Sequence, residues 1–193
     1  LNVKPMIERI RNLSLDVVVI DGQSTDRTVP IAKDLDVEVL DREGFGKWSS
    51  IIKCMEYAES NGYDKVITID CDQTYFPEDI PKIVNFADQY DMVVGVRPIQ
   101  NIAFLRRLAN HAMNFMTNLL YKSNVKDMAT GFRLMDVKKF KPFLNAQSFD
   151  IEPQIYAVGL RENFKITEVD VRYSKRVGDS KVNILHFFAI IYR

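Results

Sequence analysis

Short runs of β-branched residues that alternate with helical patterns are the feature of this chain that most limits its fold. Residues 15–21 read LDVVVID, residues 65–70 read KVITID and residues 91–96 read DMVVGV, and a helical pattern follows each of them. Continuous Val and Ile runs are typical of strands that are covered on both faces. The pattern therefore predicts an α/β domain with a largely parallel sheet between layers of helices.

Composition fits one globular domain and excludes one class of partner. The chain has 193 residues, of which 47% are hydrophobic and 27% are charged, and its formal net charge is zero. A neutral chain lacks the positive field that attracts nucleic acid, so we expect no nucleic-acid partner. The sequence contains no run of about 18 apolar residues of the kind that crosses a bilayer.

Residues 101–121 form the longest helical stretch, and two interpretations of it stand. Leu105, Leu108, Phe115 and Leu119 recur at helical spacing, and further apolar residues spread onto other faces. One interpretation is a buried core helix. The other is a helix that turns one face toward lipid or a hydrophobic acceptor.

Polar residues gather where the predicted strands end. Residues 21–28 and 70–79 follow two of these strands, and residues 42–47 follow a further predicted strand, VEVL (37–40). Ligands of open parallel sheets bind at that edge. Asp70 and Asp72 are two residues apart, so in extended chain both carboxylates point the same way and repel each other unless a cation lies between them. Oxygen ligands suit Mg²⁺ or Mn²⁺. The alternative is a solvated acidic turn that caps the next helix.

Four blocks in this order resemble family 2 glycosyltransferases of the GT-A fold. The resemblance is closest to the polyprenyl-phosphate sugar synthases, which load mannose or glucose onto dolichyl or undecaprenyl phosphate. It implies a Rossmann-like three-layer sandwich with a mixed, mainly parallel sheet. The blocks are VVVIDGQSTDRT (17–28), DCDQTYFPED (70–79), DMATGFRLM (127–135) and EVDVRYSKRVGDSKVN (168–183).

The resemblance also implies an activity. It is the inverting, metal-dependent transfer of a sugar from a UDP- or GDP-linked donor to polyprenyl phosphate, with Mg²⁺ or Mn²⁺ as cofactor, at the cytoplasmic face of a membrane. Two alternatives stay open. One is a soluble family 2 enzyme that glycosylates a hydroxyl of a glycan or protein, and the other is a non-catalytic nucleotide-binding or scaffold domain.

On the donor side the resemblance assigns five residues. Asp21 contacts the nucleotide, and Arg42 and Gly46 belong to a loop beside it. Asp70 binds ribose or metal, and Asp72 is the principal metal ligand. Without the resemblance, Asp21 reads equally as a cap of the following helix.

On the acceptor side the resemblance makes Asp127 and Arg133 catalytic together with Asp72. Guanidinium groups match phosphate oxygens, so Arg106, Arg107 and Arg133 are candidates for binding the acceptor phosphate or the donor diphosphate. Arg106 and Arg107 fit the solvated face of a helix equally well. A basic segment closes over the donor phosphates in the family, and its residues here are Arg176, Ser180 and Lys181.

The acceptor decides whether a general base is needed. A sugar hydroxyl must lose a proton, whereas a phosphate monoester is already an anion at neutral pH because its second pKa is near 6. Asp150 and Glu152 lie where hydroxyl-transferring relatives hold a base. Neither is assigned that role here.

The two ends of the sequence carry further expectations. Residues 1–182 are expected to form the catalytic domain, and residues 183–193 (NILHFFAIIYR) begin an amphipathic or membrane-associated helix. The family also has a first strand that ends in Pro-x-Tyr-Asn-Glu and grips the nucleotide. No such motif occurs in the 193 residues, and Leu1 would lie in the helix after that strand.

Overall fold

The computed structural model describes residues 3–44, 46–144 and 151–174. The expectations for Asp150, Arg176, Ser180, Lys181 and residues 183–193 therefore lie outside the described residues. The helices, 3₁₀ turns and strands are α1 (Val3–Arg11), β1 (Val18–Asp21), α2 (Thr28–Asp34), β2 (Glu38–Asp41), α3 (Lys47–Ser60), β3 (Lys65–Thr68), η1 (Pro77–Asp79), α4 (Ile80–Val84), β4 (Met92–Val96), η2 (Ile99–Asn101), α5 (Phe104–Tyr121), β5 (Arg133–Asp136), α6 (Val137–Phe140), η3 (Lys141–Phe143), α7 (Ile151–Arg161) and β6 (Ile166–Asp170).

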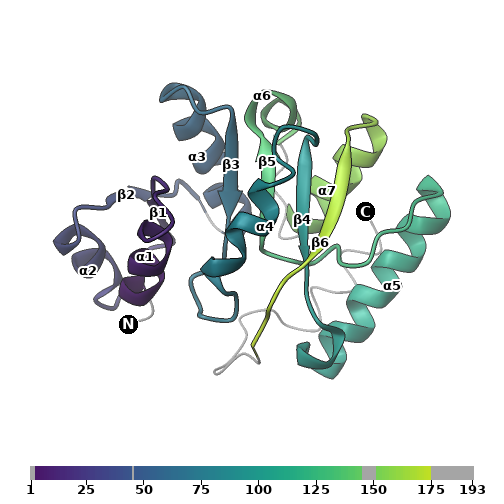
Figure 1. Cartoon of the computed structure of the whole chain (residues 1–193), viewed down its shortest axis with the longest axis horizontal. Coiled ribbons are helices and arrows are strands. Elements are labelled where there is room, and N and C mark those ends of the chain that lie inside the picture. Colours follow the sequence, from purple (N-terminus) through teal and green to yellow (C-terminus); the bar gives the residue numbers. More distant parts are fainter. Residues whose placement is uncertain (1–2, 45, 145–150, 175–193) are drawn as a thin grey trace.

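Four of the strands form a mixed sheet in the order β3-β5-β4-β6. β5 runs antiparallel to both of its neighbours, and β4 pairs with β6 in parallel (Figure 1). β3 and β4 therefore run in the same direction on either side of a reversed strand. The expected α/β fold with a mixed sheet is confirmed, and the reversal of β5 is the detail that the repeating pattern did not reveal.

β1 and β2 form a separate parallel pair beside this sheet (Figure 1). Among the described residues, no strand pairs with the second edge of β1 or of β3. α1 connects the two parts, because Val3 and Ile7 pack with the α2–β2 unit while Arg9 donates two hydrogen bonds to Glu78 of η1, at 2.7 and 2.6 Å. α1 thus links the unit that contains β1 and β2 to the segment that follows β3.

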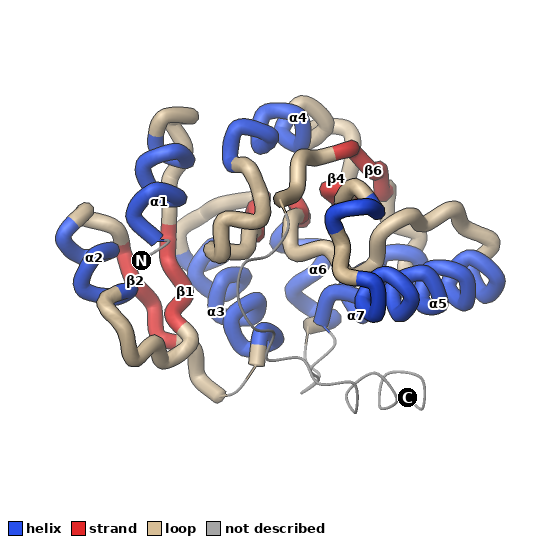
Figure 2. The backbone as a smooth tube through the Cα atoms, turned by 90° about the horizontal axis from the view of Figure 1, so that it is seen from below, coloured by secondary structure: helices blue, strands red, loops and turns tan. Residues whose placement is uncertain are grey.

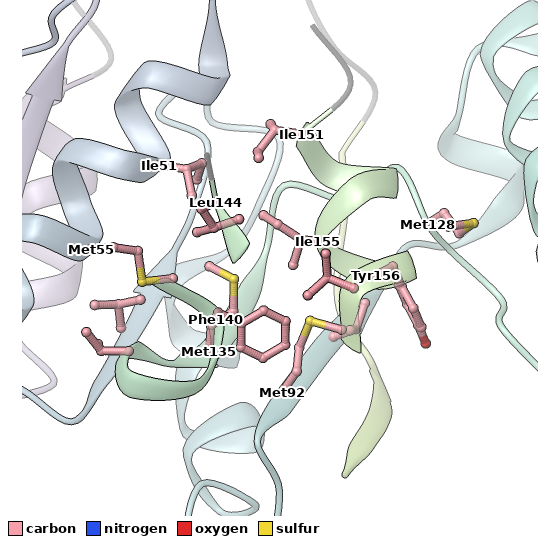
Figure 3. Packing of buried hydrophobic residues seen from close by; sticks show 14 of the residues in the cluster. Ile51, Met55, Met92, Met128, Met135, Phe140, Leu144, Ile151, Ile155 and Tyr156 are labelled. Atoms are coloured by element: carbon pink, nitrogen blue, oxygen red, sulfur yellow. The ribbon is translucent and has the colours of Figure 1, made fainter. Parts of the chain in front are cut away.

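The four-stranded sheet is covered on both faces. Met92 and Val94 of β4 belong to the cluster under α3, α6 and α7, whereas Val93 belongs to the cluster that also contains Ile80 and Ile83. Figure 3 shows the first cluster, where side chains from α3, α6 and α7 converge on the sheet. The alternation along β4 is that of a central strand between two layers, as expected for a three-layer sandwich.

α5 lies at the periphery beside α7 (Figure 2). Its buried residues are Asn110, Asn114 and Thr117, while Leu119 and Leu120 are 69% and 73% exposed. The interpretation of residues 101–121 as a buried core helix is therefore wrong. The asparagines bond an adjacent loop, which leaves the apolar stripe outside. No helix in the described part of the chain is long and apolar enough to cross a membrane.

Candidate functional site

The loops that follow β1 and β2 are tied together through Arg42. Its guanidinium donates to the carbonyl oxygens of Gly46 at 2.8 Å and Gly22 at 3.1 Å. A Cβ on Gly22 would lie 3.2 Å from the guanidinium carbon, and Gly46 adopts a φ of 86°, which favours glycine. Arg42 thereby fixes the backbone of both loops at the edge where the sequence places the nucleotide.

Asp21 ends β1 and turns back onto its own loop. Its Oδ2 accepts a hydrogen bond from the backbone N–H of Ser24 at 2.9 Å. Burial acts to raise the pKa of Asp21, but hydrogen bonds from Ser24, Gln23 and Gly22 outweigh burial, so that the pKa lies below its ordinary value. The carboxylate is charged and fixed, as both the nucleotide role and the capping role require.

Asp70 and Asp72 lie on the turn that follows β3. Asp72 Oδ1 accepts hydrogen bonds from the backbone N–H and the hydroxyl of Thr74, at 3.1 and 2.5 Å. A Cβ on Gly131 would lie only 2.3 Å from Oδ2 of Asp70, so the close approach of these two segments requires glycine. The block that contains Gly131 is thus brought against the acidic turn, although the two are far apart in the sequence.

Lys47 completes this group, and the analysis of the sequence missed it. Its Nζ lies 2.5 Å from Oδ1 of Asp70 and 2.8 Å from Oε1 of Glu152 in the first turn of α7. Burial acts to lower the pKa of Lys47, but the two carboxylates raise it above its ordinary value. A signal was present in the sequence, because Lys47 is the first residue of α3, where the helix dipole disfavours a cation that has no anionic partner.

The chemistry of this acidic turn fits a divalent cation. Among the described residues, no group of three or more His, Cys, Asp or Glu side chains could hold a metal ion without other ligands. Mg²⁺ sites that also bind phosphates use only one or two carboxylates and take their other ligands from the substrate and water. Asp70 and Asp72 provide that number of carboxylates, and the structure holds them on one turn.

The predicted catalytic residue Asp127 is buried in an ion pair. Its carboxylate accepts hydrogen bonds from Nε and Nη2 of Arg97 at 2.8 and 2.7 Å, and from Nδ2 of Asn110 at 3.0 Å. The side chains of Arg97 and Asp127 are 10% and 2% exposed. Sequence reasoning did not single out Arg97, although it follows β4 as Asp70 follows β3.

Three asparagines of α5 hold the segment that carries Asp127. Asn114 donates to the carbonyl of Lys126 at 2.5 Å and accepts from the N–H of Met128 at 3.1 Å. Asn110 and Asn118, one turn before and after, make the same kind of double contact with this segment. Each asparagine thus uses both ends of its amide, which fixes the loop on the helix.

Arg133 faces the interior. It is 1% exposed, and its guanidinium donates to the carbonyl oxygens of Glu152, at 2.7 Å, and of Met128. Burial lowers the pKa of Arg133 from its ordinary value. Arg133 therefore joins the Asp127 segment to the start of α7 within the interior. Its guanidinium is buried.

Arg106 and Arg107 line a pocket of about 410 Å³ at the start of α5, together with Arg97. The guanidinium of Arg107 lies 5.4 Å from the centre of the Phe104 ring. Phe104 also lines this pocket and is one of the exposed apolar side chains of α5. We refer to these as the outer face of α5, whose most exposed members are Phe104, Leu105, Leu108, Phe115, Leu119 and Leu120.

Comparison with known proteins identifies the fold first. A glucosyl-3-phosphoglycerate synthase of Mycobacterium tuberculosis, solved in complex with Mn²⁺, UDP and phosphoglyceric acid, superimposes with a TM-score of 0.72 at 16% identity, over 94% of this chain and 67% of that chain. The fold is thus the GT-A fold of glycosyltransferases. The model of glycosyl transferase family 2 matches residues 1–144, and the chain belongs to that family.

Two curated relatives are similar over most of the chain. The dolichyl-phosphate hexose transferase of Haloferax volcanii is 28% identical over 181 residues, which cover 92% of this chain and 78% of that protein. The UDP-N-acetylglucosamine–dolichyl-phosphate N-acetylglucosaminyltransferase of Methanococcus voltae is 22% identical, over 99% of this chain and 88% of that protein.

Proposed function

We propose that this protein transfers a sugar from a nucleoside diphosphate sugar to a polyprenyl phosphate. The observation that carries the proposal is that the pocket lined by Arg97, Arg106 and Arg107 is also lined by Phe104, a member of the outer face of α5. This arrangement suits an acceptor with an anionic head and an apolar chain. Both curated relatives described above carry dolichyl phosphate in their names, which supports the same acceptor class.

On the donor side, Asp70 and Asp72 hold Mg²⁺ or Mn²⁺, and Asp21, Arg42 and Gly46 contact the UDP or GDP part of the donor. The cation, when bound, neutralises the charge that develops on the departing diphosphate. The protein itself aligns the sugar and fixes the two carboxylates, since a leaving group of this charge needs preorganised partners.

On the acceptor side, Arg106 and Arg107 bind the lipid phosphate, while the polyprenyl chain follows Phe104, Leu105 and Leu108. A phosphate oxygen attacks the anomeric carbon as the bond to the diphosphate breaks, with inversion at that carbon. The phosphate is already an anion, so the step needs alignment and no general base. Glu152 agrees with this reading because its carboxylate pairs with Lys47.

Asp127 and Arg133 support the site through the residues and segments that they hold in place. Asp127 fixes Arg97, which lines the acceptor pocket, and Arg133 holds the Asp127 segment against α7. Outside the described residues, our proposal for Arg176, Ser180 and Lys181 is that they close over the donor phosphates. Residues 1–182 then form the catalytic domain, and residues 183–193 begin a helix at the membrane.

We further propose that the outer face of α5 rests on the cytoplasmic surface of a membrane. The helix is amphipathic, its apolar side is exposed, and Arg106, Arg107 and Lys122 are basic residues suited to anionic headgroups. A polyprenyl phosphate in the bilayer would then reach the arginine pocket without leaving the lipid.

Transfer of a radiolabelled sugar to a short polyprenyl phosphate tests the proposal. Donors would include UDP-glucose, UDP-N-acetylglucosamine and GDP-mannose, each with Mn²⁺, Mg²⁺ or EDTA. We expect one donor to give a lipid-linked product that requires the cation, and Asp72→Asn to abolish it. A product formed only on a hydroxyl acceptor, or nucleotide binding without any turnover, would contradict the proposal.

A variant pair tests the acceptor site. Arg106→Gln combined with Arg107→Gln should raise KM for the polyprenyl phosphate roughly 10- to 100-fold and leave donor affinity unchanged, since each phosphate loses two charge-assisted partners. Arg161→Gln, an exposed arginine of α7, is the matched control. Equal losses of donor and acceptor affinity would argue against an acceptor role.

A further inference from the structure

Lys47 is bound to two carboxylates from different elements, and the proposed reaction gives it no task. Its Nζ lies between Asp70, after β3, and Glu152, in α7, at 2.5 and 2.8 Å. The three side chains are 34%, 36% and 21% exposed, so the cluster borders solvent and a ligand can reach it. An ion pair placed only for stability would gain little at such exposure.

The segments that carry the two acids are anchored, whereas the lysine carries its charge on a flexible side chain. Oδ2 of Asp70 packs against the backbone at Gly131, which limits rotation of that carboxylate. The carbonyl oxygen of Glu152 accepts from the buried Arg133, which anchors the start of α7. Lys47 instead carries its charge on a flexible four-carbon stem, so it is the member of the group that can change partner.

A divalent cation at Asp70 would meet the ammonium of Lys47 at the same carboxylate. Two positive charges within a few ångströms repel, and the repulsion is strong where the surroundings are partly desolvated. Glu152 offers the ammonium a second anion, because Lys47 already contacts both carboxylates.

We propose that Lys47 is a positioning residue that competes with the divalent cation for Asp70, and that Glu152 retains the ammonium when the cation binds. The inference rests on the proposed function, since it takes Asp70 and Asp72 as the cation site. Its consequence is that cation binding changes the link between α3 and α7, the two helices that carry Lys47 and Glu152.

Binding of Mn²⁺ alone, followed by the electron paramagnetic resonance signal of the free ion, tests the inference without turnover. In Lys47→Met the competitor is absent, and we expect Mn²⁺ to bind on the order of tenfold more tightly. In Glu152→Gln the ammonium of Lys47 loses its second carboxylate and competes more strongly with the cation for Asp70. We therefore expect Mn²⁺ to bind several-fold more weakly. A merely structural role would weaken binding in both variants, so the opposite signs are the diagnostic result.

Two control variants complete the experiment. Lys53→Met removes a lysine of the same helix, whose partner Glu43 is exposed and 3.8 Å away, and should leave Mn²⁺ affinity within about twofold. Asp72→Asn should remove Mn²⁺ binding in the wild-type and Lys47→Met backgrounds alike. Thermal unfolding of each variant verifies that it is folded.

The possible outcomes separate this inference from the proposed function. Equal or weaker Mn²⁺ binding by folded Lys47→Met, or tighter binding by Glu152→Gln, overturns the role of Lys47. Metal-dependent transfer by the wild-type protein would still support the proposed function in that case. If neither the wild-type protein nor Lys47→Met binds Mn²⁺, both the inference and the assigned cation site fail.

Discussion

The proposed donor and acceptor sides of the site are held in different ways. Asp70 and Asp72 lie on one turn. Asp70 is partly exposed and contacts Lys47, which also contacts Glu152, whereas Asp72 accepts a hydrogen bond from Thr74. Asp127, on the acceptor side, is buried in a bidentate pair with Arg97. The carboxylates on the donor side are therefore charged and accessible. On the acceptor side, Arg97 already neutralises the charge of the buried Asp127.

This contrast separates the residues that we expect to act on substrates from the residues that support them. Accessible acids with exchangeable partners suit a cation and a nucleotide that come and go. A buried pair cannot exchange partners without a large cost, so it suits a fixed support for the arginine pocket. The predictions below test this division.

Removal of Asp127 should have the largest effect. Asp127→Ala leaves Arg97 buried without its carboxylate, and we expect the free energy of unfolding to fall by about 3–5 kcal/mol. Asp72→Ala, on the proposed donor side, removes the hydrogen bonds from Thr74 at a partly exposed turn and should cost about 1 kcal/mol. Urea denaturation measures both, and similar losses would break the comparison.

Substitutions on the two faces of α5 should give the second-largest difference in unfolding free energy. Asn114→Leu leaves the N–H of Met128 and the carbonyl of Lys126 without their partners, which should cost about 2–3 kcal/mol of unfolding free energy. Leu119→Asn makes the reverse change on the outer face and should stay within about 0.5 kcal/mol of wild type. A larger loss from Leu119→Asn than from Asn114→Leu would show that the helix faces are assigned wrongly.

A methyl group at Gly131 tests whether the position of Asp70 matters for binding on the donor side. In Gly131→Ala the new Cβ collides with the carboxylate of Asp70, and we expect affinity for the Mn²⁺–nucleotide complex to fall about tenfold. Gly62→Ala is a control because its φ of 75° makes alanine strained, while no atom lies near the new Cβ. Calorimetric titration should show the loss in the first variant alone.

The outer face of α5 should matter for lipid and little for stability. Leu108→Gln removes an exposed apolar side chain, and partition onto anionic vesicles should weaken about fivefold, in line with roughly 1 kcal/mol of lost apolar burial. Val84→Gln changes an exposed apolar residue of α4 and serves as the control. Vesicle sedimentation separates the two, and equal behaviour would remove the membrane role.

The smallest effect concerns pH and Asp21. Because the pKa of Asp21 is lower in the folded protein than in the unfolded chain, its stabilising contribution is present above about pH 4 and is lost as pH falls through the folded-state pKa. Asp21→Asn keeps an acceptor for the N–H of Ser24 but does not titrate. Between pH 6 and pH 3, wild type should therefore lose more unfolding free energy than the variant, and equal losses would contradict the low pKa.

Local features of the fold could be predicted from the sequence. The expected strands over residues 15–21, 65–70 and 91–96 contain β1, β3 and β4. These elements depend on β-branched runs and on apolar spacing, which are properties of short segments. The acidic turn after β3 could be predicted for the same reason.

What could not be predicted depends on contacts between distant segments. Periodicity shows that α5 has two faces but does not tell which one is buried, and the repeat of Asn110, Asn114 and Asn118 at intervals of four was the available signal. Arg133 was expected at a phosphate, and only the packing of α7 against β5 turns it inward. The reversed direction of β5 is likewise a property of the whole sheet.

The position of β5 has a consequence for the order in which this protein can assemble. β3 and β4 each pair with β5, which the ribosome makes after both of them. Until residue 136 has emerged, β3 lacks β5, the strand that pairs with it among the described residues, and Asp70 lacks the glycine on which it packs. Such non-local pairing slows folding and leaves apolar strand edges uncovered during synthesis. The proposed cation site can therefore form only once β5 has been inserted between β3 and β4.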